Sequence, residues 1–265
     1  ARLKDMFNDF EFRDGVRLAG VNSINWARVL AQVVYYFSSA VSLGAPQREI
    51  SFTVPTGNFG DVFAGYIATQ MGLPIDRLIV ATNQNDILHR CLKTGAYQTD
   101  AVIPSISPSM DIQVSSNFER ALFYAHDGDG AAITQLMGAL KSNGGFEISP
   151  GIRQKLAEDF GSGHASEIET STTIASNFTS TAEVLCPHSA IGVKVADDAR
   201  DLSVPMITLA TAHPAKFPDA VEAATKMRPG LPDRMSDLYD RPERVTRVAN
   251  DLSSLQELIR ERTAQ

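Results

Sequence analysis

The sequence predicts an α/β protein with a mostly parallel sheet, flanking helices and a largely helical insertion. Three observations lead to this fold class. Short apolar runs rich in β-branched residues alternate with longer segments of helical period. At 265 residues, with 43% apolar and 21% charged residues, the chain can bury a sizeable core. Between about residues 95 and 180 the strand signal fades, leaving helical segments with Ser/Thr/Gly-rich joints.

The individual elements follow from the periodicity of the apolar residues. Strands are predicted at 16–20, 50–54, 77–81, 183–185 and 204–210. Helices are predicted at 25–43, 61–72, 86–94, 116–126, 131–142, 150–160, 166–176, 189–199, 214–227 and 250–263. Strands separated by helices of this length form crossover units of a parallel sheet. We therefore expect 1–95 and 181–265 to contribute to one α/β domain, the latter with a C-terminal helix, and 96–180 to form the mostly helical insertion.

Composition and charge exclude several classes of function. A net charge of −7 without a basic stripe argues against nucleic-acid binding. Cys91 and Cys186 are far apart and in no metal-ligand spacing, so we expect no disulfide scaffold, no metal site and a reducing, cytoplasmic environment. No apolar run approaches the roughly 18 residues of a membrane span.

The stretch FTVPTGNFGDVFAGY, residues 52–66, places a glycine turn between a predicted strand and a predicted helix. Gly57 and Gly60 allow close approach of the backbone, and the amides of 57–61 could converge on an anion at the start of the helix. The loop lacks the Gly-Lys-Ser/Thr of a Walker motif and the third glycine of the dinucleotide fingerprint. Two interpretations remain open on the pattern alone: a phosphate site, or a tight turn with Asp61 as the helix cap.

Five blocks in order along the chain resemble the threonine synthase family. They are VNSINWARVLAQVVYYF at 21–37, VPTGNFGDVFAGYIATQMGLPIDRLIVATNQNDIL at 54–88, SPSMDIQVSSNFER at 107–120, PHSAIGV at 187–193 and TAHPAKFPDAV at 211–221. Essentially the whole chain is covered, and the phenylalanine within the glycine loop is similar to the fungal and enterobacterial branch. The resemblance implies the pyridoxal-phosphate fold of the tryptophan synthase β-subunit (fold type II).

The resemblance also implies an activity, a cofactor and partners. Members of the family convert O-phospho-L-homoserine and water to L-threonine and inorganic phosphate, with pyridoxal 5′-phosphate as cofactor. By resemblance, the cofactor phosphate is bound by the backbone of Gly57, Asn58, Phe59, Gly60 and Asp61. A carboxylate aimed at a phosphate would repel it, so we expect the Asp61 side chain to turn away and cap the helix. The family branch suggests a monomer.

Two further groups are candidate site residues. Taken alone, Thr211 is more often a strand-end hydroxyl bonded to backbone; the resemblance reverses this and places it against the pyridine nitrogen. A polar cluster where strand 16–20 gives way to a helix could bind the substrate's phosphate or carboxylate, with the arginine as the cation, or could simply cap the helix. The cluster consists of Asn22, Ser23, Asn25 and Arg28.

Other residues receive a weaker interpretation. His188 and His213 could act as general bases, but each stands beside a proline at a joint, where histidine often caps or orients a loop. The family block commonly begins Asp-Pro-His, whereas Cys186 precedes Pro187 here. The block at 107–120 supports the family but suggests no chemistry from its spacing.

The Schiff-base lysine of the family has no counterpart in this sequence. It belongs to a Phe-Lys-Asp motif upstream of the asparagine cluster, whereas the only Lys-Asp here, Lys4-Asp5, matches a later helix. The first residues, ARLKDMFNDFEF, lack an initiator Met and a helix cap. We therefore expect a C-terminal portion of a longer enzyme, without its N-terminal lobe, with no catalytic residue in this chain and with no activity alone. The alternatives are a phospholyase of the same fold and a non-catalytic phosphate- or vitamer-binding module.

Overall fold

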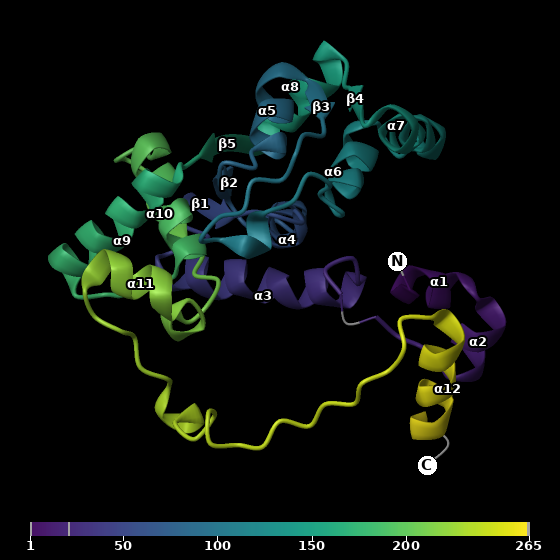
Figure 1. The fold of residues 1–265 in the computed structure, drawn as a ribbon. Coiled ribbons are helices and arrows are strands. Elements are labelled where there is room, and N and C mark those ends of the chain that lie inside the picture. The colour runs from purple at the N-terminus through teal and green to yellow at the C-terminus, as the bar shows by residue number, and fades with distance from the viewer. Residues whose placement is uncertain (1, 21, 264–265) are drawn as a thin grey trace. The chain divides into compact units, whose positions relative to one another are not determined.

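A computed structural model describes residues 2–20 and 22–263, and the chain divides into two compact units (Figure 1). One unit consists of Ala1–Asn22 together with Pro232–Gln265, and the other is Ser23–Leu231. Every candidate site residue except Asn22 belongs to Ser23–Leu231, which we call the sheet unit.

The sheet unit contains a four-stranded sheet in the order β5-β2-β1-β6. Its strands are β1 (Ile50–Pro55), β2 (Ile75–Thr82), β5 (Phe160–His164) and β6 (Met206–Thr208). Every pairing is parallel, which confirms the predicted fold class. Because parallel strands share one direction, the residues that follow β1 and β6 emerge at the same edge of the sheet.

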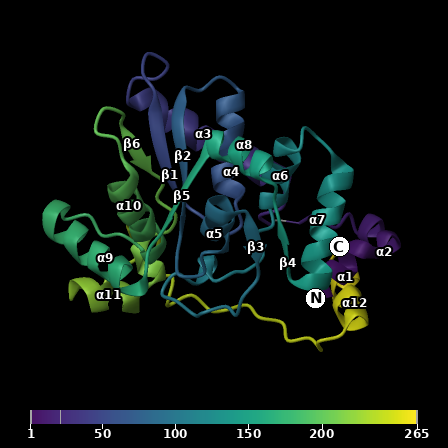
Figure 2. The ribbon, with the colours of Figure 1, turned by 90° about the horizontal axis from the view of Figure 1, so that it is seen from above.

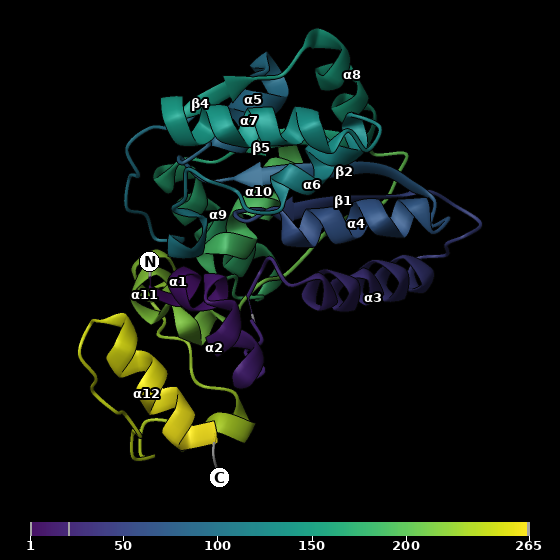
Figure 3. The ribbon, with the colours of Figure 1, turned by 90° about the vertical axis from the view of Figure 1, so that its right-hand side faces the viewer.

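Helices cover both faces of the sheet, as the alternation of side chains along β2 shows. Leu78 and Val80 point into the main core, toward α3 (Trp26–Ser42) and α4 (Gly60–Gln70). Ile79 and Ala81 point to the other face, where α10 (Pro187–Ala199) packs. Figure 2 shows α10 and α4 on opposite sides of the strands, and Figure 3 shows α4 between α3 and the sheet. Both faces of the sheet are therefore buried.

The segment between β2 and α10 is mostly helical, and side-chain caps begin several of its helices. Asp129, Ser149 and Ser166 accept hydrogen bonds from the first turns of α7 (Gly130–Asn143), α8 (Pro150–Asp159) and α9 (Glu167–Thr181). A short antiparallel pair, β3 (Ala96–Gln98) and β4 (Gly145–Glu147), interrupts the helices. The helices of this segment are α5 (Ile87–Thr94), α6 (Phe118–Ala125), α7 (Gly130–Asn143), α8 (Pro150–Asp159) and α9 (Glu167–Thr181), and α11 (Pro218–Thr225) follows β6.

Two of the predicted strands are wrong, and three observed strands were not predicted. Residues 16–20 follow α2 (Phe10–Gly15) as a turn and irregular backbone, and Arg17 has a positive φ of 51° that is incompatible with a strand. Residues 183–185 are irregular backbone and not a strand. The strand beside β2, at one edge of the sheet, is β5 instead. The sequence of β5, FGSGH, has two glycines and little β propensity, so pairing with β2 decides its conformation.

The other unit packs its C-terminal helix against its N-terminal helices. It contains α1 (Arg2–Asn8), α2 (Phe10–Gly15) and α12 (Leu252–Thr263), with a 3₁₀ turn at Asp233–Met235. Gln256 of α12 donates to the Asp9 carboxylate at 2.8 Å, and the Arg260 guanidinium lies 5.1 Å from the Phe12 ring centre. Within 2–20 and 22–263, no helix is long and apolar enough to cross a membrane.

Gly65 on α4 allows the close approach of α3 and β2. A Cβ at this position would lie 2.6 Å from both the Tyr36 ring and the Leu78 side chain. We expect Gly65→Ala to lower the free energy of unfolding by about 1–3 kcal/mol through overpacking. Gly138 on α7 is the matched control, because its Cβ would meet nothing within 4 Å and alanine there should stabilise by about 0.5–1 kcal/mol. Urea unfolding of both variants measures the difference, and equal effects would contradict the packing argument.

Candidate functional site

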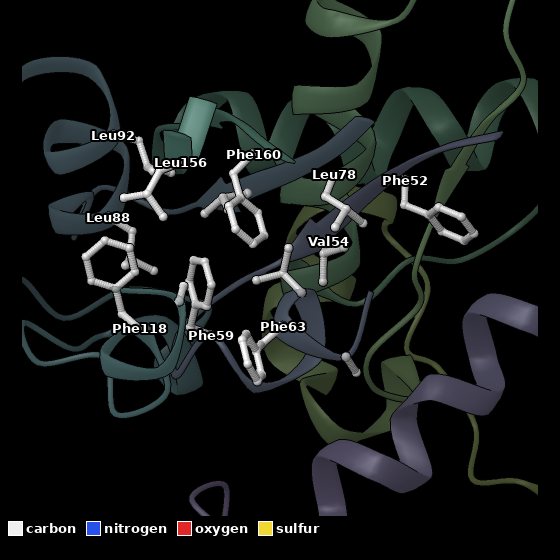
Figure 4. Close-up of a cluster of buried hydrophobic side chains, with 14 of the residues drawn as sticks. Phe52, Val54, Phe59, Phe63, Leu78, Leu88, Leu92, Phe118, Leu156 and Phe160 are labelled. Atoms are coloured by element: carbon white, nitrogen blue, oxygen red, sulfur yellow. The ribbon is translucent and has the colours of Figure 1, made fainter. Parts of the chain in front are cut away.

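The glycine loop, residues 56–61, connects the carboxyl end of β1 to the first turn of α4. Phe59 has a left-handed backbone, with φ 62°, and its ring is buried in the core. The ring makes edge contacts with Phe118 and Phe160, both at 5.2 Å between ring centres (Figure 4). The Phe59 side chain therefore anchors the loop in the core.

A cavity of about 140 Å³ lies against this loop. Its walls are residues 55–62 on one side and Ser23, Arg28 and Gln32 on the other. The volume is several times the roughly 30 Å³ that one water molecule occupies in the liquid. The glycine loop and two members of the polar cluster before α3, Ser23 and Arg28, therefore line the same cavity.

The loop presents backbone amides rather than cationic side chains. Among the described residues, the amides of 57–61 donate no hydrogen bond to the protein, so they are available to a ligand. A Cβ on Gly57 would lie 2.7 Å from the Ser109 carbonyl oxygen, so only glycine fits between the loop and the 107–120 block. A loop of amides at a helix N-terminus suits an anion.

Asp61 does not cap α4 as the sequence suggested. The helix begins at Gly60 without a side-chain cap, and Asp61 lies in its first turn. The Tyr36 hydroxyl donates to the Asp61 carbonyl at 2.7 Å and lies 3.4 Å from its carboxylate. Loss of solvent raises the pKa of Asp61 to about 6, against the lowering effect of the Tyr36 hydrogen bond. Near pH 6 this carboxyl group is therefore partly protonated.

Thr211 follows β6 and lines a second cavity of about 170 Å³, which shares Pro55 and Gly57 with the first. Its amide donates to the Ser189 hydroxyl at 3.1 Å. Its own hydroxyl lies 3.4 Å from that of Ser189 and 3.5 Å from the Cys186 sulfur. Both Cys186 and Ser189 are buried, so they hold the exposed Thr211 at the cavity wall.

Cys186 and Ser189 contact the candidate residue Thr211, and the sequence did not indicate these contacts. Cys186 caps α10 by accepting from the Ser189 amide at 3.4 Å. Burial raises the pKa of the Cys186 thiol, but hydrogen bonding from His188, Ser189 and Thr211 outweighs burial and lowers the pKa to about 6. The replacement of aspartate by cysteine in the Asp-Pro-His pattern was the available signal, since both side chains can carry negative charge.

The two histidines have orienting contacts. His213 accepts the Ala215 amide at 3.2 Å and so caps the 3₁₀ turn Pro214–Lys216. His188 accepts the Ser109 amide at its Nε2, at 3.3 Å, and lines the second cavity. Its buried Nδ1 makes no hydrogen bond of good geometry within the described part of the chain.

The residues of the polar cluster before α3 differ in their contacts. Ser23 and Arg28 line the first cavity, and the Arg28 side chain is exposed. Asn25 caps α3, because its side chain accepts the Ala27 amide at 2.9 Å. Asn22 belongs to the other unit, and its part in substrate binding stays a prediction.

The 107–120 block, which suggested no chemistry from its spacing, contributes Ser109 and Met110 to the wall of the second cavity. Its first half is held by Asp111, whose carboxylate accepts hydrogen bonds from the side chains of Asn83, Asn85 and Ser105. Asn83 also donates to Ser107 at 2.9 Å. This network fixes the backbone at Ser109 beside Gly57. Two of its donors, Asn83 and Asn85, come from the segment after β2, 28 and 26 positions before Asp111.

Comparison with known proteins identifies relatives that match nearly the whole chain. The family model "Threonine synthase, C-terminal" matches residues 189–259. Threonine synthase of Pseudomonas aeruginosa is 51% identical over 259 residues, covering 97% of this chain and 55% of that protein. Threonine synthase of Saccharomyces cerevisiae is 44% identical over 243 residues, 84% of this chain and 47% of that protein.

Solved structures give the same result. The crystal structure of pyridoxal-phosphate-bound threonine synthase from Brucella melitensis superposes with a TM-score of 0.95 at 54% identity, covering all of this chain and 57% of that one. Yeast threonine synthase gives a TM-score of 0.87 at 39% identity, covering 99% and 57%. The chain spans about half the length of the relatives that it matches. In sequence and in fold, the chain belongs to the threonine synthase family and corresponds to a C-terminal portion of its members.

Proposed function

We propose that the protein containing this chain is a threonine synthase, which converts O-phospho-L-homoserine and water to L-threonine and inorganic phosphate with pyridoxal 5′-phosphate as cofactor. One observation carries the proposal. The glycine loop after β1 and Thr211 after β6 line adjoining cavities at the same edge of the sheet. Together with the relatives, this arrangement favours a ligand that carries both a phosphate and a heteroaromatic ring.

The residues present fit that cofactor. The amides of residues 57–61 would hold its phosphate. The glycine loop contains no lysine or arginine, so the loop itself would bind the phosphate through its backbone and not through a cationic side chain. The Thr211 hydroxyl would face the ring nitrogen, held in place by Ser189 and Cys186. When bound, pyridoxal phosphate supplies an electron sink for bond changes at the substrate's carbon atoms.

Arg28 and Ser23 would serve the substrate side of the site. Arg28 provides a positive charge at the wall of the cavity opposite the glycine loop. A guanidinium can bind two phosphate or carboxylate oxygens at once, which suits O-phospho-L-homoserine. Because the side chain is exposed, it can reach a ligand that enters from solvent.

No residue of this chain is assigned as the catalytic base or as the lysine that attaches the cofactor. We place that lysine in the part of the longer relatives that this chain does not match. The division at 95 and 180, the monomeric state and the cytoplasmic location also stay predictions. The role of this chain would be to bind and orient the cofactor and the substrate and to stabilise their charges.

Product analysis tests the activity. The natural protein that contains this chain is supplied with O-phospho-L-homoserine and pyridoxal 5′-phosphate, and threonine, phosphate, ammonia and keto acid are quantified. We expect equal amounts of threonine and phosphate. Phosphate with ammonia and keto acid would instead show a phospholyase. No consumption of substrate would contradict the proposal.

A further inference from the structure

The second half of the 107–120 block is bonded directly to the glycine loop. The Ser115 hydroxyl donates to the Gly57 carbonyl at 2.7 Å. The Asn58 carbonyl accepts two hydrogen bonds from Asn117, one from its amide at 3.0 Å and one from its side-chain Nδ2 at 2.9 Å. Two consecutive carbonyls of the loop are thus bound by residues almost 60 positions later.

These bonds fix the direction of the loop amides. In a planar trans peptide, the carbonyl of one residue and the N–H of the next point in opposite directions. Fixing the Gly57 carbonyl therefore turns the Asn58 N–H away from Ser115, and fixing the Asn58 carbonyl turns the Phe59 N–H away from Asn117. Both residues line the cavity, and neither amide donates to another described group.

Asn117 also reaches the opposite wall of the cavity. Its Nδ2 donates to the Ser23 carbonyl at 3.0 Å as well as to that of Asn58. Its Oδ1 accepts a short hydrogen bond from Arg120, which donates to the Ile24 carbonyl at 2.8 Å. Asn117 is fully buried, so water does not compete for these bonds. One side chain thus connects the wall at Ser23 with the wall at Asn58.

We propose that Ser115 and Asn117 are positioning residues, which hold the amides of Asn58 and Phe59 toward an anionic phosphate group and keep the two walls of the cavity at a fixed separation. Neither residue lines the cavity. They act through the backbone that they bind, and Arg120 orients the Asn117 side chain. This inference rests on the proposed function, because it takes the cavity to be a phosphate site.

Asn117→Asp is the sharpest test, because it preserves the size of the side chain. It keeps the amide bond to the Asn58 carbonyl and an oxygen for Arg120, but it loses both Nδ2 donations. Asn177→Asp is the matched control. The Asn177 side chain also donates to a carbonyl, that of Glu183 at 2.9 Å, but at the end of α9. Ser115→Ala is a second, independent variant, which also covers the case that Asn117→Asp does not fold. It adds no charge beside the cavity, so weaker phosphate binding in Ser115→Ala cannot come from charge repulsion.

The ligand is inorganic phosphate, titrated at neutral pH into the ¹⁵N-labelled natural protein that contains this chain, freed of cofactor, with dissociation constants taken from the amide shifts. We expect Asn117→Asp and Ser115→Ala each to bind phosphate about tenfold more weakly than the wild type and Asn177→Asp to bind it unchanged. If Ser115 and Asn117 only helped the protein to fold, the variants would have a lower melting temperature but unchanged Asn58 and Phe59 amide resonances. The melting temperature and these two resonances are therefore measured as well.

The outcomes separate the two proposals. If the wild type binds phosphate and both Asn117→Asp and Ser115→Ala bind it equally well, the positioning role is overturned and the phosphate site stands. If weaker binding in these variants occurs without a change at the Asn58 and Phe59 amides, the positioning role is also overturned. If the wild type shows no saturable binding, the phosphate site itself is wrong, and the positioning role is wrong with it.

Discussion

Gly57→Ala is expected to weaken phosphate binding at the glycine loop by about tenfold or more and to destabilise the sheet unit by about 1–3 kcal/mol. A Cβ at this position would lie 2.7 Å from the Ser109 carbonyl and 3.5 Å from the Met110 Cα. Both neighbours are backbone atoms, held by the Asp111 network, so they cannot rotate away as a side chain would. The loop would have to move instead, and its amides with it.

Isothermal titration with phosphate and urea unfolding measure the two effects of Gly57→Ala. Gly151→Ala is the control, because a Cβ at Gly151 would meet nothing within 4 Å in the first turn of α8. It should leave phosphate affinity unchanged. Wild-type affinity in Gly57→Ala would show that the loop tolerates the displacement, and the close approach would then have no part in binding.

Asp61→Asn is expected to stabilise the protein above about pH 6 and to strengthen phosphate binding there. The pKa of Asp61 is about 6 in the folded chain, against an ordinary value of 3.8, because the carboxyl group has lost solvent. A raised pKa means that folding favours the protonated form. The stability contributed by this group is therefore full below pH 4 and is lost as the pH rises through 6.

The size of the effect follows from the shift. A difference of about two pKa units corresponds to about 3 kcal/mol at most, of which asparagine should recover a large part above pH 7. Asparagine is neutral at every pH and can still accept the Tyr36 hydroxyl. It also removes a negative charge from the cavity wall, so phosphate should bind more tightly.

Urea unfolding of Asp61→Asn at pH 4 and pH 8 tests this expectation. The variant should equal the wild type near pH 4 and exceed it at pH 8. Asp219→Asn is the control, because Asp219 is 91% exposed and paired with Arg228 at the surface. Its effect should stay below about 1 kcal/mol at either pH. A stability difference for Asp61→Asn that is independent of pH would show that Asp61 has an ordinary pKa in the folded protein.

The sequence allows the architecture to be predicted where local pattern and tertiary environment agree. The apolar runs of β1 and β2 are buried on both faces, and the caps Ser149 and Ser166 begin helices where their residue types indicate. Prediction from the sequence fails at β5, because FGSGH forms a strand only through its pairing with β2. Local propensity cannot reveal a strand that depends on its neighbour.

The candidate site shows the same division. The glycine loop and Thr211 are visible in the sequence because their motifs are local. Ser115 and Asn117 act on carbonyls 58 and 59 positions away, and nothing in the spacing of SPSMDIQVSSNFER indicates those partners. Cys186 was visible only as a departure from a pattern, and its contact with Thr211 required the fold to bring α10 beside β6.

The most direct test of the phosphate site is an amide titration of the ¹⁵N-labelled chain with pyridoxal 5′-phosphate, with pyridoxal as the comparison ligand. We expect saturable shifts that are largest at the amides of 57–61 with pyridoxal 5′-phosphate and absent there with pyridoxal, because only the former carries the anion that these amides would bind. Equal shifts with both ligands, or shifts that leave 57–61 unchanged, would contradict a phosphate site built from the backbone of this loop.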